Sequence, residues 1–260
     1  MSARSRRFPL PLARVGAHGV EAARRDLARA RPTASADALP RGLGLDSQAV
    51  RDRMVARLRA DGIRCEPVLA AMARVPRHAF VDAALVAQAY EDTALPIGHG
   101  QTISQPWVVA RMIELLLERR HIAGGPGRVL EIGTGCGYQA ALLACLGTSV
   151  ISIERLRPLF DRAQAHLAPL RLSNLRLVYG DGRLGHAPNA PYDSIISAAG
   201  GEDVPEAWLQ QLAVGGRLVA PIRHGAADTQ VLVTMDRDAS GWTRHHHEAV
   251  RFVPLRSGTA

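Results

Sequence analysis

A strand that runs directly into a glycine-rich turn is the feature that most constrains the fold of this chain. Residues 129–137 read Val-Leu-Glu-Ile-Gly-Thr-Gly-Cys-Gly, so an apolar run is followed by glycines at three alternate positions. Glycine lets the backbone pass close under a ligand, and a helix that follows would offer its free N–H groups to that ligand. The turn therefore predicts a binding site at the carboxyl edge of a parallel sheet.

The chain after residue 128 repeats this order of strand and helix. Short β-branched or aliphatic runs predict strands at 129–132, 150–153, 175–178, 194–197 and 217–220, with helices at 137–146, 157–168 and 205–212. Such alternation is typical of a parallel sheet with helices on both faces. Two last runs, 231–235 and 243–253, flank a turn without a helix and predict an antiparallel hairpin. We therefore expect an α/β fold with a doubly wound, mostly parallel, seven-stranded, Rossmann-like sheet.

The spacing of the glycines distinguishes between two kinds of cofactor. A dinucleotide-binding turn reads G-x-G-x-x-G, and its third glycine would stand at Tyr138, whereas this turn has its third glycine one residue earlier. The spacing favours S-adenosyl-L-methionine over NAD. A tight turn from strand to helix without any ligand is the alternative, because glycine serves turns in general.

Two acidic residues stand where consecutive strands end. Glu154 closes the second predicted strand, where a carboxylate can accept hydrogen bonds from both hydroxyls of a ribose. Asp181 lies in Gly-Asp-Gly after the third strand and is placed to accept from an adenine amino group. Each acid alone fits a surface carboxylate, but together they indicate a cofactor site. Asp193, before the fourth strand, is interpreted as a turn or strand-entry residue.

Three helices are expected before the sheet begins. Ser47 is a good N-cap for a first helix that ends at Gly62, and the other two are predicted at 67–75 and 82–90. Residues 91–106 have no helical or strand period, and a loop of that length in a compact domain is usually functional. It leads into a helix from about 105 to 120.

Charge and composition limit the possible partners. The net charge is +8, and residues 1–50 hold nine Arg against four acids, so little of the excess belongs to the rest of the chain. This balance makes nucleic acid an unlikely partner of the globular part. There is no apolar run of about 18 residues, so no membrane span is expected. Three cysteines without metal spacing fit the reducing cytoplasm.

The expected organisation is an arm and one domain. We expect residues 1–46 to form a basic, disordered arm and residues 47–260 to form the domain. Within the domain we expect N-terminal helices and a substrate loop at 47–121, a cofactor-binding core at 122–222 and the C-terminal hairpin at 223–260. No metal site is predicted, because the adjacent histidines 245–247 alternate between the faces of a strand. A monomer is expected.

Several motifs together resemble one family of class I methyltransferases, the protein-L-isoaspartate O-methyltransferases. The motifs are V-P-R-H-A-F-V at 75–81, L-P-I-G-H-G-Q-T-I-S-Q-P at 95–106, L-E-I-G-T-G-C-G at 130–137, G-D-G at 180–182, G-G-R-L at 215–218 and R-F-V-P-L at 251–255. The resemblance covers about residues 47–256. The motif at 95–106 is the most specific, because other methyltransferases share only the glycine turn.

The resemblance implies an activity and a set of site residues. It implies transfer of a methyl group from S-adenosyl-L-methionine, leaving S-adenosyl-L-homocysteine, to the free α-carboxylate of L-isoaspartyl residues in damaged proteins and peptides. The methyl ester then closes to a succinimide, which begins the repair. Ser104 is implied as the active-site residue. The predicted cofactor-binding residues are Thr102, Ile103, Glu131, Gly133, Thr134, Gly135, Gly137, Glu154, Asp181 and Gly182.

The residue types agree with this chemistry. An α-carboxyl group has a pKa of roughly 3.5 and is already ionised at pH 7, so no general base is needed. Accordingly the fourth strand ends in Ser-Ala-Ala-Gly-Gly at 197–201 and not in the N-P-P-Y or D-P-P-Y of amino-group methyltransferases. Ser104 would orient the acceptor carboxylate, and the alternative for Ser104 is a helix N-cap. Cys136 and Ala198 depart from the family pattern, and Ala198 removes a hydroxyl from the site.

Two other functions stay open on the sequence alone. A related carboxylate methyltransferase could act on aspartyl side chains of one specific peptide. A non-catalytic binding module could keep the fold and use the basic arm to contact nucleic acid or another protein, with binding that weakens steeply in salt.

Overall fold

The structure is a computed structural model that describes residues 48–118, 125–225 and 229–260. All of these residues belong to one compact unit. The expected basic arm at 1–46 and the N-cap at Ser47 lie outside the described residues.

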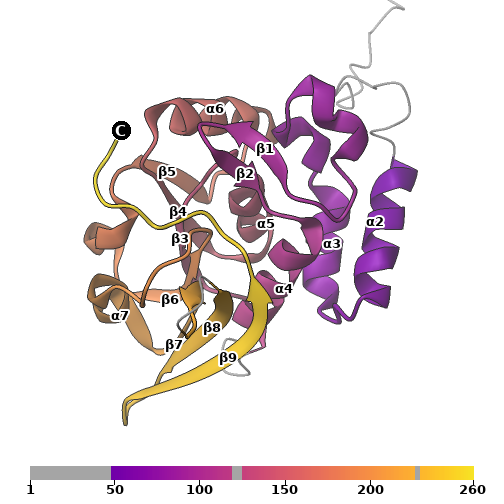
Figure 1. The fold of residues 1–260 in the computed structure, drawn as a ribbon. Helices are drawn as coiled ribbons and strands as arrows, with labels where there is room; N and C mark the ends of the chain where they lie inside the picture. The colour runs from indigo at the N-terminus through magenta and orange to yellow at the C-terminus, as the bar shows by residue number, and fades with distance from the viewer. Residues whose placement is uncertain (1–47, 119–124, 226–228) are drawn as a thin grey trace, which may run out of the picture. The chain divides into compact units, whose positions relative to one another are not determined.

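A seven-stranded sheet in the order β5-β4-β3-β6-β7-β8-β9 forms the centre of this unit (Figure 1). The strands from β5 to β7 are parallel, and β8 and β9 are antiparallel to their neighbours. The bounds are β3 Arg128–Ile132, β4 Ser149–Glu154, β5 Leu175–Tyr179, β6 Tyr192–Ser197, β7 Leu212–Arg223, β8 Gln230–Arg237 and β9 Trp242–Val250. The predicted fold class is confirmed.

Helices cover both faces of the sheet, because the central strands are apolar on both sides. Val129 and Val150 pack into a cluster that includes buried side chains of α2 to α6. Leu130 and Ile151, one residue further along their strands, pack into a second cluster with Trp208 of α7. The helices are α2 Gln48–Ala60, α3 Glu66–Arg74, α4 Pro106–Leu117, α5 Tyr138–Leu146, α6 Arg157–Leu167 and α7 Glu206–Gln211. Burial on both faces explains why the strands read as continuous apolar runs.

The prediction of a third N-terminal α-helix at 82–90 is wrong. The structure has a short 3₁₀ helix there, η2 Ala83–Gln88, which follows another, η1 Arg77–Phe80, and no residue of η2 is buried. A short segment without a buried face gains too little from packing to offset the cost of nucleating an α-helix.

The segment 91–106 is also more regular than predicted. It contains an antiparallel hairpin of β1 Leu95–Gly98 and β2 Gln101–Ile103. The two turn residues, His99 and Gly100, have φ values of 53° and 68°. Two consecutive left-handed residues make a turn whose twist matches that of the strands. The prediction missed it because His-Gly is a weaker signal than Asn-Gly or Asp-Gly.

The C-terminal segment leaves the sheet earlier than predicted and returns across it. β9 ends at Val250, not at residue 253. The Gly200 N–H then donates to the Val253 carbonyl, and the Ala260 N–H donates to the Arg155 carbonyl, both at 2.8 Å. The yellow end of the chain therefore crosses the carboxyl edge of the parallel strands (Figure 1). We call residues 251–260 the C-terminal strap.

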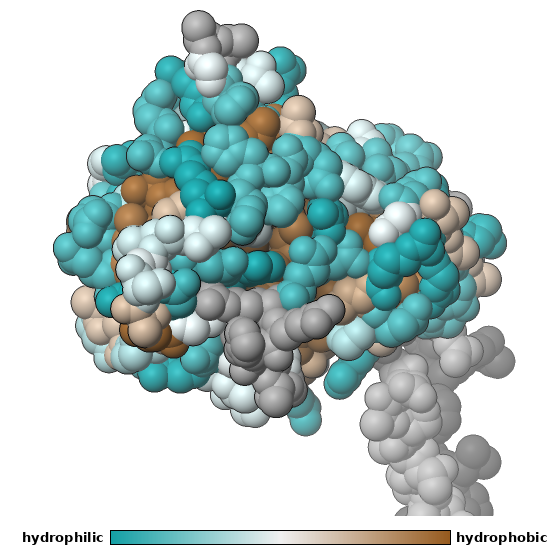
Figure 2. Space-filling view, turned by 90° about the horizontal axis from the view of Figure 1, so that it is seen from below, coloured by the Kyte–Doolittle hydropathy of each residue, from teal (hydrophilic) through white to brown (hydrophobic). Residues whose placement is uncertain are grey.

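The surface is mostly hydrophilic on the face seen in Figure 2, where apolar side chains form small separate areas between polar ones. The large apolar residues that stand exposed are spread over the fold: Tyr179, Leu184, Val214 and Trp242. Among the described residues, no helix has the length and apolar character needed to cross a membrane.

Candidate active site

The glycine turn after β3 adopts a backbone that side chains disfavour. Gly133, Gly135 and Gly137 have φ values of 87°, 57° and 94°. The N–H groups of Gly133 and Thr134 both donate to the Ile153 carbonyl, at 2.9 and 3.1 Å. The turn is therefore anchored to β4 by main-chain hydrogen bonds.

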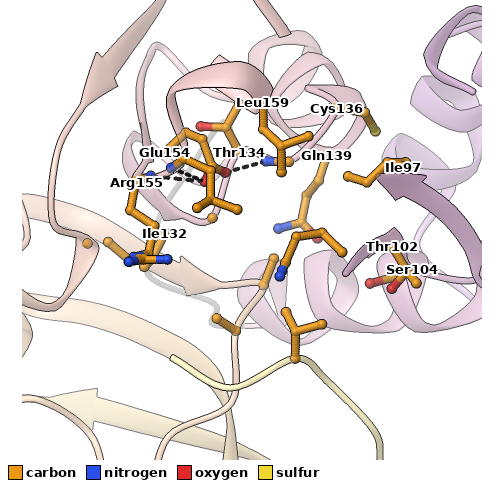
Figure 3. A pocket seen from close by; sticks show the side chains of 18 of the residues that line it. Ile97, Thr102, Ser104, Ile132, Thr134, Cys136, Gln139, Glu154, Arg155 and Leu159 are labelled. Carbon is orange, nitrogen blue, oxygen red and sulfur yellow. Dashed lines mark hydrogen bonds between the residues drawn. The ribbon is translucent and has the colours of Figure 1, made fainter. Parts of the chain in front are cut away.

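A cavity opens above this turn. It is bounded by the turn, the end of β4, the β1–β2 hairpin and the C-terminal strap. Figure 3 shows Glu154 and Arg155 on one side of it and Ile97, Thr102 and Ser104 on the other. Of the predicted site residues, those that line the cavity are Thr102, Ile103, Ser104, Gly133, Thr134, Gly135, Glu154 and Gly182.

Glu154 is buried at the end of β4 and has its carboxylate directed at backbone N–H groups. Its Oε2 accepts from Gly135 N, and its Oε1 accepts from Arg155 N and Leu156 N, each at 2.9 Å. The carboxylate thus joins the glycine turn to the turn before α6. It borders the cavity at the position where the sequence predicts ribose recognition, and that role stays a prediction.

Glu131 lies beneath the glycine turn and is fully buried. Its Oε2 accepts from Ser152 Oγ at 2.5 Å, and the Thr134 hydroxyl lies 2.6 Å from the same Ser152 oxygen. Its Oε1 and the Gln139 Nε2 have no hydrogen-bond partner among the described residues. Burial raises the pKa of Glu131 to about 8, although the hydrogen bond from the Ser152 hydroxyl favours the ionised form and lowers it. Glu131 does not itself line the cavity.

Asp181 and Gly182 are neighbours in the chain, but only Gly182 lines the cavity. The Asp181 carboxylate accepts from Arg183 N at 2.9 Å and from Gly258 N of the strap at 2.6 Å, and Asp181 does not line the cavity. Gly182 does line it, and a Cβ at Gly182 would lie 2.6 Å from the Ile132 Cγ2 atom. Only glycine lets the loop after β5 approach β3 this closely.

Gly137 and Asp193 have structural roles in the described residues. Gly137 does not line the cavity, and a Cβ there would lie 2.9 Å from Leu167 Cδ1 of α6. Asp193 Oδ2 accepts from Arg128 N at 2.7 Å at the entry of β3, in line with its interpretation as a strand-entry residue.

Ser104 stands between β2 and α4 and lines the cavity. The helix α4 is not capped by Ser104: its N-cap is Gln105, and Asp92 Oδ1 accepts from Trp107 N at 2.8 Å. The N-cap alternative for Ser104 is therefore wrong. Because Asp92 accepts the N–H of the first turn of α4, the Ser104 hydroxyl is not needed as a cap and can bind a ligand in the cavity.

The sequence missed part of the lining. Ile97, Gln139 and Leu159 lie along the cavity from three different elements, and residues 253–256 of the strap close it. The motif at 251–255 belongs to the family resemblance, but nothing in the sequence shows that this segment returns to the cofactor turn. Gln139 and Leu159 had no signal beyond their places in the first turns of α5 and α6.

A buried arginine supports the wall of the cavity from behind. Arg77 is fully buried, its Nε donates to the Ala89 carbonyl at 2.7 Å, and its guanidinium lies 5.0 Å from the ring centre of Tyr138. Burial lowers the pKa of Arg77 and raises the pKa of Cys136 to about 11. Arg77 thus joins the segment before the hairpin to the first residue of α5.

The sheet order, the glycine turn and the acids at consecutive strand ends define a class I methyltransferase. A solved protein-L-isoaspartate O-methyltransferase matches with a TM-score of 0.70 and 28% identity over 80% of this chain and 66% of that chain. A putative protein-L-isoaspartate O-methyltransferase from Plasmodium falciparum, solved in complex with S-adenosyl-L-homocysteine, matches with a TM-score of 0.66 and 24% identity over 79% of this chain and 98% of that chain.

Sequence comparisons give the family. The model of the family described as protein-L-isoaspartate(D-aspartate) O-methyltransferase matches residues 49–260. The protein-L-isoaspartate O-methyltransferase of Methylibium petroleiphilum is 60% identical over 97% of this chain and 96% of its own length. That of Leptothrix cholodnii is 64% identical over 84% of this chain and 77% of its own length. The chain belongs to the protein-L-isoaspartate(D-aspartate) O-methyltransferase family, and it methylates the isoaspartyl carboxylates of other proteins with S-adenosyl-L-methionine as donor.

Proposed function

We propose that the cavity above the glycine turn holds S-adenosyl-L-methionine and that Ser104 orients the acceptor carboxylate beside it. The observation that carries this proposal is that a single cavity is lined both by the turn, with Glu154, and by the hairpin end, with Ser104. The predicted cofactor side and the predicted acceptor side of the site thus come from segments far apart in the chain.

The residues present fit such a cofactor. Gln139 lines the cavity and has a buried Nε2 without a partner, and Glu131 Oε1 lies unpartnered beneath the turn. Buried polar atoms without partners are costly unless a ligand or water satisfies them. We assign Gly133, Thr134, Gly135, Gln139 and Glu154, which all line the cavity, to holding the cofactor. Glu131 and Gly137 do not line it and support the turn from beneath and from its helix side.

Asp181 joins this set only if the strap moves. Asp181 does not line the cavity, and Gly258 N of the strap donates to its carboxylate, so recognition of an adenine amino group by Asp181 would require this part of the strap to shift. Gly182, the next residue, does line the cavity.

The chemistry needs positioning and a dry site more than acid–base groups. When bound, S-adenosyl-L-methionine supplies a methyl group activated by its sulfonium. The acceptor carboxylate is ionised at pH 7, so the protein has no proton to remove. Ser104 would donate a hydrogen bond to one carboxylate oxygen and leave the other aimed at the methyl group, while Ile97 and Leu159 exclude water.

Ala198 shapes the floor of the same site. Its Cβ lies 3.6 Å from the position that a Cβ of Gly133 would take, and it lines the cavity. Since Ala198 has no hydroxyl, the acceptor can receive a side-chain hydrogen bond from the Ser104 side but not from this residue.

The test is methyl transfer to a pair of matched peptides. Labelled S-adenosyl-L-methionine is offered with an isoaspartyl peptide and with its normal aspartyl twin. The proposed function predicts a base-labile methyl ester on the isoaspartyl peptide alone. Equal labelling of both would instead point to aspartyl side chains of a specific peptide, and no labelling of either would contradict the proposed site.

We also propose that the enzyme works as a cytoplasmic monomer without a nucleic-acid partner. Cys65, Cys136 and Cys145 are all unpaired, which suits a reducing compartment. Light scattering would give the monomer mass, and titration of the whole chain with nucleic acid should show no binding.

A further inference from the structure

The β1–β2 hairpin carries one wall of the active site but forms a sheet of its own. It pairs with no strand of the seven-stranded sheet. An isolated two-stranded hairpin is marginally stable in water, so its position depends on contacts from other elements. Figure 1 shows the hairpin beside α6, the helix that follows β4.

One side chain of α6 donates directly to the hairpin backbone. Arg162 Nη1 donates to the Ile97 carbonyl at 2.6 Å, from 65 residues away in the sequence. Its Nη2 lies 3.8 Å from Asp82 Oδ1, which is a longer and more exposed ion pair. Hydrogen bonds to charged donors are stronger than neutral ones, so the bond to Ile97 is the main link.

The residue that receives this bond touches both halves of the site. Ile97 lines the cavity, and its Cδ1 lies 3.3 Å from where a Cβ of Gly135 would stand. The helix that carries Arg162 also contributes Leu159 to the cavity wall. Fixing the Ile97 carbonyl to α6 therefore fixes the distance between the hairpin and the glycine turn.

We propose that Arg162 is a positioning residue for the acceptor. It acts through the hairpin, by holding β1 and with it the strand β2 that leads to Ser104. A displacement of about 1 Å between reacting groups can lower the rate by about 100-fold. The proposal rests on the assignment of Ser104 to the acceptor side of the site.

Three variants separate this role from a general effect on folding. Arg162→Met keeps most of the aliphatic stem and removes the donor. Arg162→Lys keeps a charged donor that can reach a carbonyl. Arg157→Met is the matched control, because the Arg157 side chain pairs with Asp161 on the exposed side of the same helix and stacks on surface rings.

The measurements are kcat/KM for an isoaspartyl peptide, the dissociation constant of S-adenosyl-L-homocysteine by calorimetry, and amide hydrogen exchange over residues 93–104. We expect Arg162→Met to lower kcat/KM by at least tenfold and to speed exchange in the hairpin, with cofactor affinity changed by less than about threefold. Arg162→Lys should recover most of the rate, and Arg157→Met should match the wild type.

Two results would overturn the proposal. The first is a rate for Arg162→Met within twofold of the wild type. The second is a parallel loss of rate and cofactor affinity that Lys does not repair, since this would assign Arg162 to the stability of α6. If the wild type itself failed to methylate the isoaspartyl peptide, the failure would lie in the proposed function and not in Arg162.

Discussion

Two glycine-containing turns belong to the elements that form the two walls of the active site, and they are held in different ways. The turn 133–137 lies between a strand and a helix of the central fold, and its N–H groups donate to the Ile153 carbonyl of the neighbouring strand. The turn at His99 and Gly100 closes a separate two-stranded hairpin, which is held by side chains such as Arg162. The cofactor wall is thus part of the sheet, whereas the acceptor wall depends on contacts between distant segments.

Alanine substitution in the two turns should show this difference most strongly. Gly137→Ala and Gly100→Ala both place a side chain at positive φ, which costs about 1–2 kcal/mol each. At Gly137 the new Cβ also meets Leu167 and adds about 1–3 kcal/mol of overpacking, while at Gly100 nothing lies within 4 Å. Urea unfolding measures both. Equal destabilisation would show that the turns are held alike.

Removing the hydroxyl on the acceptor side should change the rate but not cofactor binding. Ser104→Ala is expected to lower kcat on the order of 100-fold, because one preorganised donor to the reacting group is lost. The dissociation constant of S-adenosyl-L-homocysteine should stay nearly constant, since the sheet holds the cofactor side. Ser104→Thr, which keeps a hydroxyl, should retain part of the rate. Wild-type kcat in Ser104→Ala would remove Ser104 from the mechanism.

Removing the carboxylate on the cofactor side should have the opposite signature. Glu154→Ala is expected to weaken binding of S-adenosyl-L-homocysteine by about 1.5–3 kcal/mol, the usual range for hydrogen bonds to a charged group. Calorimetry measures the affinity, and Asp161→Ala, which removes an exposed carboxylate on α6, serves as the control. Unchanged affinity in Glu154→Ala would contradict ribose recognition by this residue.

The buried acid under the cofactor turn should make stability depend on pH. The pKa of Glu131 is about 8 in the folded protein, against 4.5 as its ordinary value. Between these values the unfolded chain has lost the proton that the folded chain keeps. The stabilisation is therefore fully present below about pH 4.5 and is lost as the pH rises to about 8, by at most about 1.4 kcal/mol per pH unit.

Urea unfolding of the cofactor-free protein from pH 5 to 8.5 checks this dependence. Glu131→Gln cannot ionise and should show a flatter profile than the wild type. Glu202→Gln, on an exposed side chain, should keep the wild-type slope. The same slope in Glu131→Gln as in the wild type would assign the pH dependence to other groups.

The sequence predicted the strand, the glycine turn and the acid at the end of β4, because these signals are local. The β3 strand, the glycine turn and the Glu154 position all lie within one strand–helix–strand unit, where spacing decides the geometry. On the acceptor side, the His-Gly turn of the hairpin was too weak a signal, and the capping of α4 by Asp92 joins residues 15 apart in the chain. Contacts of that kind leave no periodic pattern.

The sequence by itself determined the order of strands and helices from β3 to β9 and the glycine turn, because hydrophobic period and glycine placement act over a few residues. Its motifs indicated the family by resemblance. Only the tertiary structure decided that Glu131 is buried beneath the turn, that Asp181 binds the strap and that Arg162 holds the hairpin. These contacts join segments that are distant in the chain, and the packing of the whole unit decides which of those segments lie together.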